Sequence, residues 1–294
     1  MKLLSEHACW GGNQRFFQHE SNECAGQMRF AVYEPPQAQT GPVPVLYYLA
    51  GLTCTEETFP TKAGAQRLAA EHGVMLVTPD TSPRGPRLPG DDASWDFGLA
   101  AGFYVDATQA PWSSHYRMYS YVTRELPALV KREFATADTN RQSIMGHSMG
   151  GHGALVCALR NPAQYRSVSA FAPIVAPSHV PWGHKAFGNY LGTNRNDWLA
   201  YDAAHLVQQA PRMDTILIDQ GLGDKFLAEQ LRPDLFEDAC RRSGQKLQLR
   251  RHAQYDHGYY FIQTFMPDHI AFHAALLHQP DQVLALTTQS LERK

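Results

Sequence analysis

The sequence lacks the features that usually mark membrane, secreted and nucleic-acid-binding proteins. No apolar run is long enough to cross a bilayer, and the first residues lack the apolar stretch of a signal peptide. Lysine and arginine number 26 against 28 aspartate and glutamate residues, and the basic residues are dispersed. We therefore expect a cytoplasmic protein with no membrane partner and no nucleic-acid partner.

Cysteine is also scarce. There are 5 cysteines, an odd number at wide spacings, and no C-x-x-C pair occurs. This pattern favours reduced thiols over a disulfide framework or a zinc site. The 14 histidines do not indicate a metal, because H-E-x-x-H and similar ligand spacings are missing. We predict no metal and no cofactor.

Repeats and low-complexity tracts are absent, and from residue 43 onward the chain alternates between two kinds of segment. Short apolar runs predict strands at 43–49, 74–79, 143–146, 167–171, 215–219 and 246–251. Helical spacing predicts helices at 61–72, 118–134, 150–160, 226–243 and 259–277. Such nearly continuous apolar strands are typical of a mostly parallel sheet covered by helices on both faces, the α/β class.

Other segments depart from this alternation. Residues 27–33 alternate polar and apolar side chains, which predicts an antiparallel edge strand, and Pro127 predicts a kink or break in its helix. Residues 80–112 and 173–202 are rich in Pro, Gly and aromatics, and both follow strands. Ligands of open α/β sheets bind beyond the carboxyl ends of strands. We therefore expect residues 1–294 to form one domain in which these two segments are pocket walls or a small cap.

The motif Gly146-His147-Ser148-Met149-Gly150 matches G-x-S-x-G. An apolar strand precedes it and a helix rich in small residues follows, as at the nucleophile elbow of the α/β-hydrolase fold. We expect Ser148 to adopt a strained turn with positive φ, flanked by small residues because strand and helix approach closely there. The alternative is that Ser148 only caps a helix.

A serine hydroxyl needs a base, and the base needs an orienting acid. Fold order places the acid after a later strand and the histidine after the last strand, which predicts Asp224 and His257. Asp219 is the competing acid, although it falls at or inside the end of its strand. Among the other candidates, the His147 side chain is expected to point away, His252 is expected to be structural, and Asp256 is expected to lie in a loop or cap.

Acyl transfer also needs backbone N–H groups that point at the developing oxyanion. The amide of Met149, directly after the serine, is the first candidate. The second should come from the loop 50–55, where we predict the amide of Leu52, with Gly51 permitting the turn. A plain strand-to-helix loop is the alternative reading of this segment.

With these residues in place, the chain resembles the S-formylglutathione hydrolase (esterase D) family over nearly its whole length. The motifs that carry the resemblance are GLTCT at 51–55, PDTSPRG at 79–85, SWDFG at 94–98, AGFYVDAT at 101–108, GHSMGG at 146–151, PWGHKAF at 181–187, DQG at 219–221 and DHGYY at 256–260. Two departures are visible: Ala50 and Val180 stand where the family often has Ser and Cys.

The resemblance implies hydrolysis of S-formylglutathione to glutathione and formate, with Ser148, Asp224 and His257 as the triad. It implies a thiol near the site, which is Cys54 here, and relatives are often homodimers. Because formyl is the smallest acyl group, we expect a tight acyl pocket that Cys54 or Trp182 lines. The two carboxylates of glutathione call for cations, and the candidates by location are Lys185, Arg84 and Arg87.

Two other functions compete with this one. The first is a general short-chain carboxylesterase or acyltransferase on the same scaffold, which comparison of thioester and aryl ester substrates would distinguish. The second is a non-catalytic binding protein with a hydrolase fold, against which the complete order of serine, acid and histidine argues.

Overall fold

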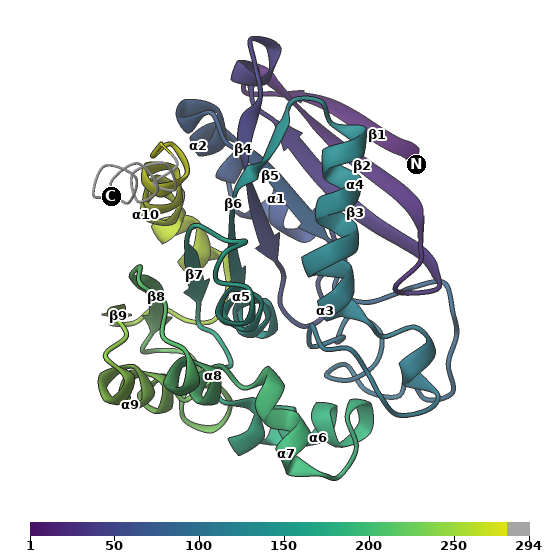
Figure 1. Cartoon of the computed structure of the whole chain (residues 1–294), viewed down its shortest axis with the longest axis vertical. Coiled ribbons are helices and arrows are strands. Elements are labelled where there is room, and N and C mark those ends of the chain that lie inside the picture. The colour runs from purple at the N-terminus through teal and green to yellow at the C-terminus, as the bar shows by residue number, and fades with distance from the viewer. Residues whose placement is uncertain (281–294) are drawn as a thin grey trace, which may run out of the picture.

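The computed structural model describes residues 1–280, and a twisted sheet runs through its centre (Figure 1). In this part of the chain the strands are β1 (Lys2–Cys9), β2 (Gly12–Ser21), β3 (Gly26–Glu34), β4 (Val43–Leu49), β5 (Met75–Pro79), β6 (Ala137–His147), β7 (Val168–Phe171), β8 (Ile216–Gly221) and β9 (Leu247–His252). Their order across the sheet is β1-β2-β3-β5-β4-β6-β7-β8-β9. The six strands from β5 to β9 in this order are parallel, which confirms the predicted mostly parallel sheet.

Helices cover both faces of the sheet (Figure 1). They are α1 (Thr58–Lys62), α2 (Ala65–His72), α3 (Met118–Ser120), α4 (Leu126–Glu133), α5 (Met149–Arg160), α6 (Pro181–Tyr190), α7 (Arg195–Trp198), α8 (Ala203–Gln209), α9 (Pro233–Ser243) and α10 (Tyr259–Leu277). Helix α2 contacts β5 and α10, while α5 contacts β4, β6, β7 and α8. The parallel strands β4, β5, β7 and β8 are buried along their whole length, which is why they form near-continuous apolar runs.

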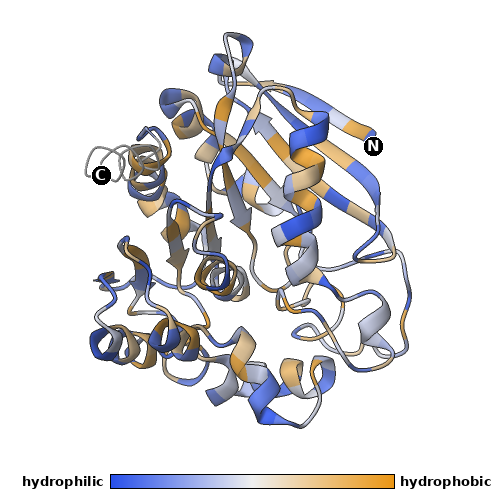
Figure 2. Ribbon diagram, viewed as in Figure 1, coloured by the Kyte–Doolittle hydropathy of each residue, from blue (hydrophilic) through white to orange (hydrophobic). Residues whose placement is uncertain are grey.

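The hydrophobic residues concentrate on the central strands and on the inner faces of the helices, and the hydrophilic residues lie outside (Figure 2). No helix within residues 1–280 is both long enough and apolar enough to cross a membrane. The core is therefore the interior of the α/β layers, and the carboxyl ends of the parallel strands are left to build a site.

The prediction of an edge strand at 27–33 is wrong in one respect. It corresponds to β3, which is antiparallel as expected but pairs on both sides, with β2 and with β5. The edge is β1, joined to β2 by a tight turn in which Trp10 and Gly11 have φ of 51° and 74°. Because β1 is mostly exposed and mixes polar with apolar residues, it gives no long apolar run that pattern reading could detect.

Two predicted helices are interrupted at residues with positive φ. Gly64, at φ 64°, separates α1 from α2, and Arg232, at φ 47°, ends a π-helical segment (Leu227–Leu231) before α9. Pro233 explains the second break, since it starts a helix well but cannot continue one. Pro127 lies at the start of α4, and the irregularity predicted there is a π-helical turn over Tyr121–Glu125. The remaining helix predictions, 150–160 and 259–277, are confirmed.

The two segments outside the alternation pack against each other beyond the ends of the strands. Phe97 stacks on Tyr190 with ring centroids 4.7 Å apart. The Tyr190 hydroxyl donates to the carbonyl of Ala101 at 2.9 Å and accepts from the amide of Gly98 at 3.1 Å. Short 3-10 turns complete these segments at Trp112–Ser114, Pro177–His179 and Leu199–Tyr201. A further 3-10 turn lies before β4, at Pro36–Gln39.

Candidate active site

Ser148 occupies the sharp turn between β6 and α5. Its backbone has φ 58° and ψ −119°, which confirms the predicted positive φ. The Ser148 amide donates to the carbonyl of Phe171 on β7 at 2.9 Å, and the residue is only 2% exposed. A non-glycine residue in this region of φ and ψ is strained, and the packing of strand and helix holds it there.

The flanking glycines are required by the close approach of backbone. A Cβ on Gly146 would lie 2.2 Å from the carbonyl oxygen of Gly150, and a Cβ on Gly150 would lie 1.9 Å from that of Leu49. Gly51 is crowded in the same way, since a Cβ added there would lie 3.2 Å from the Cβ of Ser148. The small residues therefore let the loop after β4 pass directly beside the serine.

Ser148, His257 and Asp224 converge at the carboxyl ends of the strands. His257 Nε2 lies 2.9 Å from Ser148 Oγ, and His257 Nδ1 lies 2.5 Å from Asp224 Oδ2. An ionised carboxylate only accepts hydrogen bonds, so Nδ1 carries the proton and Nε2 is free to accept the hydroxyl proton. The three residues come from the β6–α5 turn, the segment after β8 and the loop before α10.

The Asp224 carboxylate is held from both sides. Its Oδ1 accepts the amide of Phe226 at 2.8 Å, while Gln220 Nε2 lies 3.5 Å from Oδ2. The side chain is completely buried. This local turn fixes the carboxylate and, through it, the orientation of the His257 ring.

Asp219, the competing acid, belongs to a different cluster. Arg250 donates to both of its oxygens, at 2.6 and 2.5 Å, and His269 Nε2 lies 3.2 Å from Oδ2. Burial alone would raise the pKa of Asp219, but hydrogen bonds from His269 and Arg250 hold it well below its usual range. His252 lies in the same cluster, 3.2 Å from Asp219, and its ring stacks on Phe265.

His147, next to the serine, packs its ring 4.5 Å from the ring of His257. Neither ring nitrogen of His147 has a hydrogen-bond partner among residues 1–280. Burial lowers the pKa of His147 well below its ordinary value, so the ring is neutral. Sequence reasoning missed this packing contact, although it foresaw that His147 is not aimed at the serine.

Of the predicted oxyanion donors, Met149 directly follows Ser148, and Leu52 follows Gly51, which packs against Ser148. Cys54 N donates to the carbonyl of Gly51 at 3.3 Å and closes a turn in which Thr53 has φ 68°. Within residues 1–280, the amides of Leu52 and Met149 donate no hydrogen bond. Two unpaired amides beside a strained serine are suited to receive a negatively charged oxygen.

The predicted pocket residues lie at different distances from the reacting groups. Trp182 is 6% exposed and packs on Phe226, with ring centroids 4.7 Å apart, and the Phe226 ring lies 5.1 Å from that of His257. Trp182 is therefore one aromatic ring removed from the imidazole. Cys54 is partly buried, and burial raises the pKa of its thiol. Its carbonyl accepts from Arg84 Nη2 at 3.0 Å.

Two of the three predicted cations already have partners, and the third, Arg87, is exposed. Lys185 Nζ lies 2.5 Å from Asp96 Oδ1 and 2.7 Å from Ser94 Oγ, and Arg84 donates to the carboxylate of Asp80. A cleft of about 430 Å³ opens instead beside His257, lined by Gly223, Lys225, Phe226, Asp256 and Gly258. Asp256 accepts the amide of Gly258 at 2.8 Å, as expected of a capping residue.

Lys225 and Phe226 are the site residues that sequence reasoning missed. The Lys225 ammonium lies 4.9 Å from the centroid of the Phe226 ring. Their only signal in the sequence is their place directly after Asp224, and Phe226 is the first residue of the helix predicted at 226–243. The structure places them in a turn at the mouth of the cleft.

A mostly parallel sheet with a serine, an imidazole and a buried carboxylate at the carboxyl ends of its strands defines a serine hydrolase of the α/β-hydrolase fold. Comparisons with known proteins identify the family within this class. The model of the "Esterase" family matches residues 21–272. The S-formylglutathione hydrolases of Rattus norvegicus and Bos taurus are each 54% identical over 281 residues, which is 95% of this chain and 99% of each relative.

Solved structures agree with this assignment. The S-formylglutathione hydrolase from Agrobacterium tumefaciens is 52% identical, covers 94% of this chain and 100% of its own, and superposes with a TM-score of 0.92. A ferulic acid esterase at 17% identity and a TM-score of 0.71, covering 90% of this chain and 98% of its own, shares the fold alone. The chain belongs to the S-formylglutathione hydrolase family.

Proposed function

We propose that this chain hydrolyses S-formylglutathione to glutathione and formate, with Ser148 as nucleophile, His257 as base and Asp224 as the residue that orients it. The observation that carries the proposal is the 2.9 Å contact between His257 Nε2 and Ser148 Oγ, in a chain 54% identical to S-formylglutathione hydrolases.

In the first half of the reaction, His257 takes the hydroxyl proton as Ser148 Oγ attacks the formyl carbon. The C–S bond then breaks, and the sulfur leaves with the proton that His257 returns. Because a free thiol has a pKa of about 8.5, the sulfur is a good leaving group and needs little help from a proton. The product of this half is a formyl ester on Ser148.

In the second half, water replaces the thiol. His257 takes a proton from the water as its oxygen attacks the formyl ester, and Ser148 leaves with that proton while formate is released. In both halves, the carbonyl oxygen becomes an oxyanion between the amides of Leu52 and Met149. Each such donor lowers the barrier by about 3 kcal/mol.

The substrate lies in the cleft beside His257. We propose that Trp182 and Cys54 limit the acyl side, with the segments 80–112 and 173–202 as walls of a single domain. Lys225 is a better anchor for a glutathione carboxylate than Lys185, because Lys225 lines the cleft while Lys185 would first have to leave Asp96. Cytoplasmic location and a homodimer stay predictions.

The test compares kcat/KM for S-formylglutathione with kcat/KM for a short aryl ester. We expect the thioester to be preferred by about a hundredfold or more, because its glutathione part supplies additional binding in the transition state. Equal values would favour the general carboxylesterase. Lys225→Ala should lower kcat/KM for the thioester alone, with Lys185→Ala as the matched control.

A further inference from the structure

The loop after β4, residues 50–55, carries the Leu52 amide on a strained backbone. Thr53 has φ 68°, a region that non-glycine residues rarely adopt. Such a conformation persists only where the surrounding structure holds it in place. Part of that hold comes from the amide of Thr53 itself, which donates to the carbonyl of Ala100 at 3.1 Å. The remaining contacts of the loop therefore determine where the Leu52 amide points.

The carbonyl of Cys54, two residues after Leu52, accepts two side-chain hydrogen bonds from one segment of the chain. Thr81 Oγ1 donates to it at 2.6 Å, and Arg84 Nη2 donates to it at 3.0 Å. Both donors belong to the segment that follows β5. The loop is thus tied by neighbouring segments at Thr53 and at Cys54, whereas the Leu52 amide between the glycine and these anchors has no acceptor among residues 1–280.

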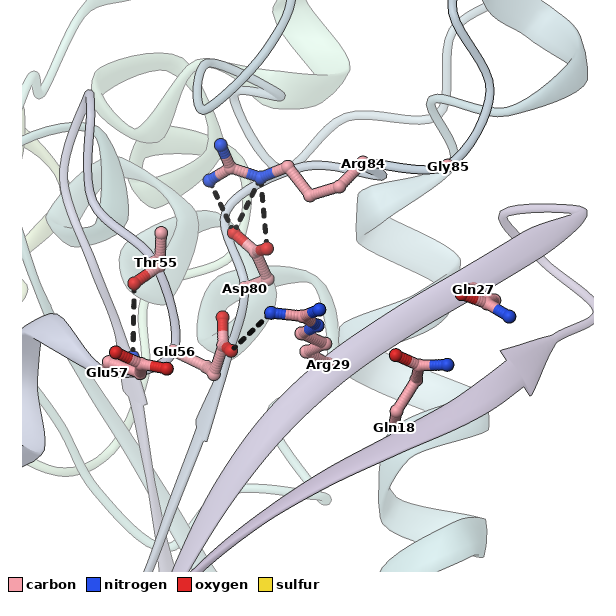
Figure 3. A pocket seen from close by; sticks show the side chains of 9 residues that line it. All are labelled: Gln18, Gln27, Arg29, Thr55, Glu56, Glu57, Asp80, Arg84 and Gly85. Carbon is pink, nitrogen blue, oxygen red and sulfur yellow. Dashed lines mark hydrogen bonds and ion pairs between the residues drawn. The ribbon is translucent and has the colours of Figure 1, made fainter. Parts of the chain in front are cut away.

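Arg84 is held in turn by Asp80, which directly follows β5. Nε donates to Asp80 Oδ2 at 3.0 Å and Nη2 to Oδ1 at 2.7 Å, and Figure 3 shows the guanidinium turned toward this buried carboxylate. The Nη2 group carries two N–H donors, so one can bind Asp80 and the other the carbonyl of Cys54. Because β4 and β5 are neighbouring parallel strands, this fork joins the two loops that follow them.

The Asp80–Arg84 pair lies apart from the catalytic cleft. Both residues line a separate cavity of about 480 Å³ (Figure 3), which shares no lining residue with the cleft beside His257. Arg84 therefore does not face a substrate bound in that cleft, and its charge is already paired with Asp80. Any influence of Arg84 on the reaction has to pass through the loop that it holds.

We propose that Arg84 and Thr81 are positioning residues for the oxyanion hole. Together they hold the carbonyl of Cys54, and the loop then fixes the Leu52 amide beside Ser148. This inference rests on the proposed mechanism, in which that amide binds the oxyanion. Such a donor lowers the barrier because it is in place before the charge develops. Loss of an anchor should therefore slow the reaction of every acyl substrate, whatever its leaving group, and leave substrate binding almost unchanged.

Thr81→Val is the first test, because valine nearly keeps the shape of threonine and removes the hydroxyl donor, while Arg84 still satisfies the carbonyl of Cys54. We expect kcat to fall about tenfold for S-formylglutathione and for a short aryl ester alike, with KM within about twofold of the wild type. The inhibition constant of an aryl trifluoromethyl ketone, which forms an oxyanion on the serine, should rise by the same factor as kcat falls.

Arg84→Ala should have a larger effect, a fall in kcat of about a hundredfold for both substrates, because the second anchor is lost and Asp80 stays buried without its cation. Arg67→Ala on α2 is the matched control. Arg67 also forms an ion pair with a carboxylate four residues away, Glu71, but this pair is exposed, and the kcat of the variant should be that of the wild type. If Arg84→Ala does not fold, Thr81→Val still decides the question.

Two results would overturn the proposal. A rise in KM for the thioester alone in Arg84→Ala would make this arginine a glutathione anchor. A lower free energy of unfolding in Thr81→Val, with unchanged kcat and unchanged inhibition by the ketone, would give the segment a purely structural role. The proposed mechanism fails in a different way, through turnover that persists in Ser148→Ala, so the two failures are distinguishable.

Discussion

One cluster of acid and imidazole lies within strand β8 and another follows it, and the two differ in what completes them. Asp219 is enclosed by Arg250, His252 and His269, and the Arg250 guanidinium neutralises its charge. Asp224 has a single imidazole partner, and the far nitrogen of that ring reaches a serine beside an open cleft. The same residue types thus support the sheet in one cluster and, in our proposal, transfer protons in the other.

Asp224→Asn is the variant with the largest expected effect, and it tests whether the Asp224 cluster is the catalytic one. The amide cannot hold the His257 tautomer that accepts the Ser148 proton, so kcat should fall about 10⁴-fold. The free energy of unfolding should change little, because the shape of the side chain is retained. Steady-state kinetics and urea unfolding of the same preparation measure both. A drop of less than about tenfold in kcat would remove Asp224 from the mechanism.

Gly51→Ala probes the oxyanion side of the Asp224 cluster. The new methyl group would lie 3.1 to 3.3 Å from atoms of His147 and Ser148, so the loop that carries Leu52 must shift. Displacement of one oxyanion donor should lower kcat about a hundredfold, with a smaller change in KM. Gly41→Ala is the matched control, because its Cβ would meet nothing within 4 Å and its activity should be that of the wild type.

Asp219→Asn tests the other cluster, and here the effect on activity should be the smallest. We expect kcat within about threefold of the wild type but a loss of about 3 kcal/mol in the free energy of unfolding, because Arg250 loses its buried partner. If kcat fell as far as in Asp224→Asn, the division between a structural and a catalytic cluster would be wrong.

The stability that Asp219 contributes should also depend on pH in a defined direction. Its pKa in the folded protein lies well below its usual range, so the unfolded chain binds the proton first as the pH falls. The difference in unfolding free energy between wild type and Asp219→Asn should be constant above about pH 5 and shrink as the pH drops below about 4. Urea titrations across this range measure it, and a difference that grows on acidification would contradict the assignment.

Much of the fold and of the candidate site could be predicted because the relevant signals are local. Ser148 stands in a motif whose glycines are forced by backbone contacts, and His257 and Asp224 each follow a strand at the place that fold order requires. Buried parallel strands such as β4 can be recognised from their apolar composition alone.

The misses come from features that only tertiary structure decides. The exposed strand β1 has no apolar pattern and is defined by its pairing with β2. The sequence around Lys185 shows no partner for its charge, but in the fold Lys185 contacts Asp96, which is 89 residues away in the chain. Lys225 and Phe226 enter the site because the chain forms a turn after Asp224, and the α-helix predicted from residue 226 begins only at Pro233.

Covalent labelling tests the central claim most directly. Intact-protein and peptide mass spectrometry after treatment with a fluorophosphonate should show one adduct per chain, on Ser148. Labelling should be lost in Ser148→Ala and slowed about 10³-fold or more in His257→Ala, while Asp219→Asn is labelled at close to the wild-type rate. An adduct on another residue, or undiminished labelling of the His257 variant, would contradict the account that these two side chains act together.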